Sequence, residues 1–80
     1  MKIHVLFFAE LREIFGSERL VEISDGSSIR EVASTFTDSS GASISEKQSL
    51  VYAVNEEFQN VDNSLKDGDH LAIMTPMSGG

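Results

Sequence analysis

The small residues at the C-terminal end are the most unusual chemical feature of this sequence of 80 residues, in which Gly79 and Gly80 follow Ser78. A terminal glycine carries its carboxylate with no Cβ beside it, so the group is narrow enough to enter a tight channel on another protein. Residues 70–80 include no Asp, Glu, Lys or Arg, although 24% of the whole chain is charged. Because burying charged side chains costs free energy, this composition suits a segment that is inserted into a partner.

Pro76 separates this tail from the strand-like segment before it. The proline ring fixes the backbone dihedral φ and its nitrogen carries no hydrogen, so the residue ends a strand and stiffens the chain. We therefore expect a folded domain over residues 1–75 and an extended tail over residues 76–80, with a reach of roughly 15–18 Å. The alternative is that the tail is a frayed terminus or a remnant of cloning.

The other residues with catalytic or metal-binding side chains match no known arrangement. Two histidines without a third ligand make a poor metal site, and adjacent carboxylates in a strand point to opposite faces. The spacing of the acidic residues does not fit a calcium loop, and no serine has a paired His–Asp motif. The residues considered are His4, His70, Asp62, Asp67, Asp69, Ser27, Ser28, Glu56 and Glu57. We expect no metal site, no resident cofactor and no catalytic cluster on this chain.

Composition narrows the class of protein further. Six Lys and Arg residues against thirteen Asp and Glu residues give a net charge of −7, which argues against nucleic acid or an anionic membrane as the partner. The absence of cysteine excludes a disulfide scaffold, a thiolate zinc site and a cysteine nucleophile. The apolar N-terminal stretch is too short to span a bilayer and lacks a cleavage site, so we expect a cytoplasmic protein. A chain of this length forms one small domain without a deep enclosed active site.

Residue periodicity predicts the elements that position the tail. Ile29, Val32 and Phe36 form one apolar stripe at helical spacing, and Ser28 and Glu31 match a capping box at the start of that helix. Four other segments alternate or are rich in β-branched residues, as strands are. The expected strands cover residues 2–8, 19–23, 50–54 and 70–75, a short helix covers 9–15, a surface loop covers 37–47, and a turn covers 55–57.

The order of these elements predicts an α+β fold in which a sheet carries one main helix on a single face. The expected core comprises Ile3, Val5, Phe7, Ile29, Val32, Phe36, Leu71 and Ile73. Strand alternation then directs Leu6, Phe8, Ala72 and Met74 to the opposite face, and an exposed apolar face usually marks an interface. Arg12 is a nearby cation that could pair with a partner's carboxylate. The alternative is that the 37–47 loop or the short helix folds over this face and covers it.

Four segments of the chain resemble the small subunits of molybdopterin synthase, which are ubiquitin-like sulfur carriers. They are residues 5–13 (VLFFAELRE), 53–55 (AVN), 65–69 (LKDGD) and 78–80 (SGG), and the resemblance extends over the whole chain. The final Gly-Gly is common to all ubiquitin-like carriers, whereas the first segment is typical of the molybdopterin branch. Members of the family often have two prolines after an aromatic residue, but here Thr75 precedes the single Pro76. The resemblance implies a β-grasp fold.

The resemblance also implies a function and its partners. An ATP-using, E1-like adenylyltransferase would adenylate Gly80, which would become a thiocarboxylate and donate sulfur to cyclic pyranopterin monophosphate inside the large synthase subunit. Family members assemble as heterotetramers of two small and two large subunits, and ATP is used by the activating partner. The residues implied at the partner interface are Phe8, Arg12, Phe58, Met74, Pro76, Met77 and Ser78, with Gly79 and Gly80 at the reacting end. The alternatives are a ubiquitin-like protein modifier and a sulfur carrier for another pathway.

Overall fold

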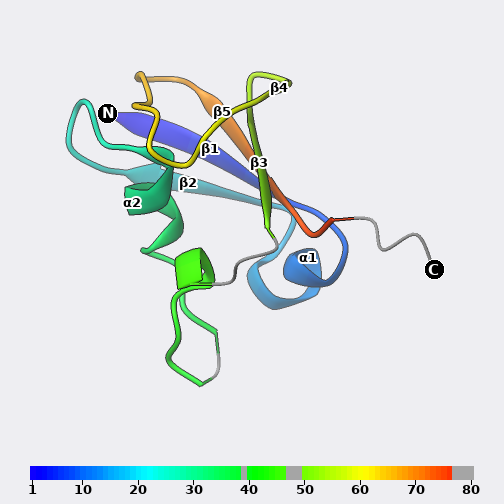
Figure 1. The fold of residues 1–80 in the computed structure, drawn as a ribbon. Coiled ribbons are helices and arrows are strands. Elements are labelled where there is room, and N and C mark those ends of the chain that lie inside the picture. The colour runs from blue at the N-terminus through cyan, green and yellow to red at the C-terminus, as the bar shows by residue number, and fades with distance from the viewer. Residues whose placement is uncertain (39, 47–49, 77–80) are drawn as a thin grey trace.

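The protein, described here by a computed structural model over residues 1–38, 40–46 and 50–76, forms one mixed sheet of five strands in the order β2-β1-β5-β3-β4. Figure 1 shows the sheet with the helices gathered on one side of it. The strands are β1 (Lys2–Phe7), β2 (Glu18–Glu22), β3 (Val51–Val54), β4 (Glu57–Phe58) and β5 (His70–Met74); the helices are α1 (Glu10–Phe15), α2 (Ile29–Ala33) and the 3-10 turn η1 (Ile44–Glu46). This is the predicted α+β arrangement, a β-grasp fold.

The two ends of the chain meet at the centre of the sheet. β1 and β5 pair in parallel, with His4 opposite His70 and Phe7 opposite Ile73, and all other strand pairs are antiparallel. Side chains directly opposite one another share a face. Because β5 lies between β1 and β3, the last strand before Pro76 is held by a neighbour on each side.

The helix α2 begins as the sequence predicts. Ser28 Oγ accepts a hydrogen bond from the Glu31 backbone at 3.2 Å, and the Glu31 carboxylate accepts one from the Ser28 backbone at 3.1 Å. The helix ends at Ala33, before the predicted end at Phe36. The hydroxyls of Ser34 and Thr35 donate to backbone carbonyls three residues earlier, and such local bonds compete with continuation of a helix.

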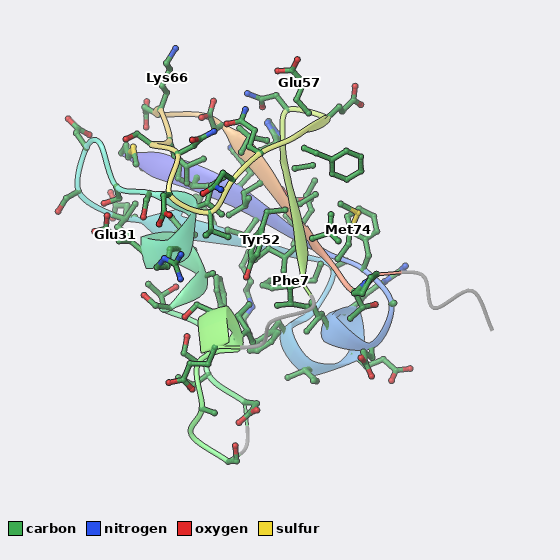
Figure 2. The ribbon with its side chains drawn as sticks, in the orientation of Figure 1. Phe7, Glu31, Tyr52, Glu57, Lys66 and Met74 are labelled. Atoms are coloured by element: carbon green, nitrogen blue, oxygen red, sulfur yellow. The ribbon has the colours of Figure 1, made fainter. Side chains whose placement is uncertain are left out.

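The core lies between the sheet and the helices. All eight residues predicted for the core are buried. Phe7, Phe15 and Phe36 form an aromatic cluster whose ring centroids are 5.0–5.5 Å apart, and Figure 2 shows Phe7 directed into the interior. Leu11 of α1 and Ile44 of η1 are buried in the same hydrophobic core as these rings. Both short elements therefore pack on the side of α2, and neither covers the opposite face of the sheet.

Two expectations about local structure differ in part from the structure. The surface loop predicted over residues 37–47 contains η1, and its Ile44 is completely buried beside α2. The turn predicted over residues 55–57 is shorter, because Glu57 already pairs with Val54 in the two-residue strand β4. Isolated apolar residues in polar surroundings gave no periodic signal for either element.

Candidate functional site

The face of the sheet opposite α2, which we call the open face, is the candidate functional site. Strand register assigns to it alternate residues of β1, β2, β3 and β5 together with one position of β4. The apolar side chains on it are Leu6, Phe8, Leu20, Val51, Ala53, Phe58, Ala72 and Met74. Three of the four large exposed hydrophobic residues, Phe8, Leu20 and Phe58, belong to this face. A contiguous apolar surface of this kind is typical of a protein interface.

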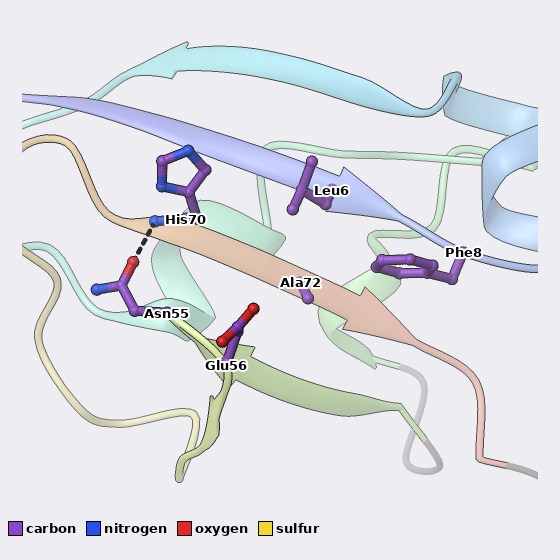
Figure 3. Close-up of a pocket in the computed structure, with 6 residues that line it drawn as sticks. All are labelled: Leu6, Phe8, Asn55, Glu56, His70 and Ala72. Carbon is purple, nitrogen blue, oxygen red and sulfur yellow. Dashed lines mark hydrogen bonds between the residues drawn. The ribbon is translucent and has the colours of Figure 1, made fainter.

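A shallow pocket of about 450 Å³ lies on the open face. Its lining residues, drawn in Figure 3, are Leu6, Phe8, Asn55, Glu56, His70 and Ala72. The pocket therefore combines an apolar floor from β1 and β5 with polar groups from the turn between β3 and β4. It joins residues that are far apart in the sequence.

The turn between β3 and β4 is fastened to the start of β5. The Asn55 backbone donates to the His70 carbonyl at 2.9 Å, and the His70 backbone donates to Asn55 Oδ1 at 3.0 Å. The Asn55 side chain also donates to Asp69 Oδ1 at 3.0 Å. From the sequence, Asn55 and Glu56 were expected only to form a turn. A loop of two residues between Val54 and Glu57 is the signal that could have indicated a tight hairpin.

The two histidines lie side by side on the open face, where His4 of β1 is opposite His70 of β5. The rings of His4 and His70 stack with centroids 4.6 Å apart and planes inclined by 10°. His4 Nδ1 is 3.4 Å from a carboxylate oxygen of Glu18 on β2. Among the described residues, no group of three or more His, Cys, Asp or Glu side chains is arranged to hold a metal ion.

The predicted interface residues divide into three sets. Phe8 and Phe58 are 45% and 75% exposed, and half-buried Met74 shares their face. Arg12 is exposed on α1 but does not line the pocket, and Pro76 is exposed two residues after the end of β5. Met77, Ser78, Gly79 and Gly80 lie outside the described residues.

The other residues weighed from the sequence have structural roles. Ser27 Oγ donates to the Ser24 carbonyl at 2.8 Å, and Ser28 caps α2. The carboxylates of Asp67 and Asp69 accept backbone hydrogen bonds from Lys2 and Lys66.

None of the helices in the described part of the chain has the length and hydropathy of a membrane span.

Comparison with known proteins identifies the family that this face and topology represent. The model of the ThiS family matches residues 5–80. The chain belongs to the ThiS family. The molybdopterin synthase sulfur carrier subunit of Chlamydomonas reinhardtii is 36% identical over 83 residues, which cover 100% of both chains. The resemblance stated from the sequence is thereby confirmed, because it names the same kind of carrier subunit.

Solved structures confirm the fold of this ThiS family member. SAMP1 from Haloferax volcanii superposes with a TM-score of 0.75 at 21% identity, covering 100% of each chain. A chain in the protein–protein complex of subunits 1 and 2 of the molybdopterin-converting factor from Helicobacter pylori gives a TM-score of 0.62 at 23% identity, again covering 100% of each chain. At these identities the likeness bears on the fold alone.

Proposed function

We propose that this ThiS family chain is the sulfur carrier of a molybdopterin synthase. The observation that supports this most directly is the open face. The chain is similar over the whole alignment to a molybdopterin synthase sulfur carrier subunit, and it presents an apolar sheet surface that neither α1 nor η1 covers. In this proposal the open face docks on the large subunit. Phe8, Phe58 and Met74 bury apolar area there, and Arg12 forms an ion pair at the margin.

The reacting group in this proposal is the carboxylate of Gly80. A free carboxylate is a poor electrophile, so an E1-like partner first joins it to AMP from ATP, with release of pyrophosphate. A donor of sulfide-level sulfur then displaces AMP and leaves a thiocarboxylate. The thiocarboxylate passes its sulfur to cyclic pyranopterin monophosphate in the large subunit, and water returns Gly80 to a carboxylate. Since the sulfur is carried on the acyl carbon, the chain needs no cysteine, and it contains none.

The proposal assigns the remaining chemistry to the partners. The folded domain over residues 1–75 supplies recognition, and the tail over residues 76–80 enters the active site of the large subunit. We propose a heterotetramer of two small and two large subunits, located in the cytoplasm where ATP is available. This chain itself would hold no cofactor or metal.

The experiment that tests the proposal combines the purified chain with the large subunit of molybdopterin synthase from the same organism. We expect a stable complex by size-exclusion chromatography, and we expect the thiocarboxylated chain to support formation of the dithiolene from cyclic pyranopterin monophosphate. Deletion of Gly80 abolishes product formation but leaves the thermal unfolding midpoint unchanged, because the residue follows the folded domain. If the deletion variant unfolds, or if the tail is found joined to lysines of other proteins instead, the proposal is wrong.

A further inference from the structure

The turn between β3 and β4 places a glutamate where backbone geometry favours glycine. Asn55 and Glu56 have φ values of 49° and 72°, and they form the two-residue loop between Val54 and Glu57. Turns of this kind prefer Asn at the first position and Gly at the second, because a Cβ is strained at positive φ. Asn55 follows that preference, whereas Glu56 does not.

The surroundings of the turn hold this strained residue in place. Asn55 is joined to Asp69 and His70 by three hydrogen bonds of 2.9–3.0 Å. Backbone strain that is held by surrounding hydrogen bonds is common at functional sites, where a side chain must be kept in one position. The turn therefore holds the Glu56 carboxylate in one position.

Glu56 is presented to the pocket on the open face. In Figure 3 its carboxylate stands at the rim of the pocket, whose apolar lining comes from Leu6, Phe8 and Ala72. The ion pairs within the described residues use the carboxylates of Asp25, Glu18 and Asp62, so Glu56 has no cation of its own there.

Glu56 is exposed at this rim, so a protein that docks over the pocket would remove water from its carboxylate. A carboxylate covered by apolar surface without a partner is strongly unfavourable, so a protein that docks there must bring a cation to Glu56. The aliphatic stem of an arginine or lysine fits the floor formed by Leu6 and Ala72. Phe8 is 45% exposed and lines the same pocket, so its ring is available for a cation–π contact.

We propose that Glu56 is an anchor for an arginine or lysine side chain of the large subunit that docks on the open face. This inference rests on the proposed function, because the docking protein is the one named there. It adds that the contact is an ion pair and that Glu56 selects a cationic side chain of the large subunit.

The test compares Glu56→Gln with Glu57→Gln as a matched control. Glu57 is the next residue, is also exposed, and does not line the pocket; Figure 2 shows its side chain directed away from the body of the protein. Both changes remove one negative charge. We expect isothermal titration with the large subunit to give a Kd about ten-fold weaker for Glu56→Gln and within two-fold of the native value for Glu57→Gln. The difference should shrink at high salt.

A second variant separates docking from folding. Glu56→Gly relieves the positive φ, so its thermal midpoint should rise by about 2–5 °C while its Kd weakens as in Glu56→Gln. If the native chain binds but Glu56→Gln binds equally well, or both Gln variants weaken binding equally, the anchor is wrong and the proposed function stands. If the native chain does not bind the large subunit, the proposed function is wrong and the anchor with it.

Discussion

Replacing Phe58 by alanine should weaken docking much more than folding. Phe58 is 75% exposed on the open face beside Ala53. Full burial of such a side chain contributes about 1.5–3 kcal/mol, so the quarter already buried stabilises the fold by only about 0.4–0.8 kcal/mol. If the large subunit buries the rest, Phe58→Ala costs the complex about 1–2 kcal/mol, which is roughly a five- to thirty-fold increase in Kd.

The assay measures both quantities on the same variants. Urea unfolding followed by circular dichroism gives the change in folding free energy, and isothermal titration with the large subunit gives the change in Kd. Ile14→Ala is the matched control, because Ile14 is 52% exposed but lies on α1 and not on the sheet. An unchanged Kd for Phe58→Ala, or an equal loss of affinity for Ile14→Ala, would contradict burial of Phe58 by the large subunit.

Three further predictions concern the folded domain. Phe7→Ala removes a ring that is 1% exposed and should lower the free energy of unfolding in urea by about 3–5 kcal/mol; a loss below about 1 kcal/mol would contradict the described core. Ser28→Ala removes the cap of α2 and should cost about 1 kcal/mol in the same assay, whereas an unchanged midpoint would exclude the cap. Burial raises the pKa of Tyr52 above 10.0 and the charge of Arg30 opposes this, so stability should fall as the pH rises through that raised pKa. Because Tyr52 is the single tyrosine and the chain has no tryptophan, phenolate absorbance measures the titration of Tyr52 directly. Arg30→Gln should raise the pKa of Tyr52 further. A Tyr52 pKa at or below 10.0 in the native chain would contradict the burial of its hydroxyl.

The sequence was most informative where a residue's partner is close along the chain. The capping box of Ser28 and Glu31 needs only local geometry, and it was predicted and found. Alternation within β1 and β5 also assigned Phe7 to the core and Phe8 to the open face, because side-chain direction in a strand has a period of two. The end of α2 was predicted less well. Its apolar stripe continues to Phe36, but the hydroxyl hydrogen bonds of Ser34 and Thr35 compete with a longer helix.

Features that depend on contacts between distant segments could not be predicted in this way. Ile44 is buried because η1 packs beside α2, although its own neighbours in sequence are polar. The pocket on the open face exists because the Asn55 turn is bonded to His70 at the start of β5, fifteen residues later. Neither the position of Glu56 at its rim nor its positive φ follows from the residue types alone.

The proposed function depends most directly on the chemistry of Gly80, which intact-mass spectrometry can measure. The chain is incubated with its E1-like partner, ATP and a sulfur donor, and the C-terminal peptide is then sequenced by mass. We predict a gain equal to the replacement of one oxygen by one sulfur, confined to Gly80 and absent without ATP. An unchanged mass, with an activating partner shown to be active on another carrier, would contradict the account.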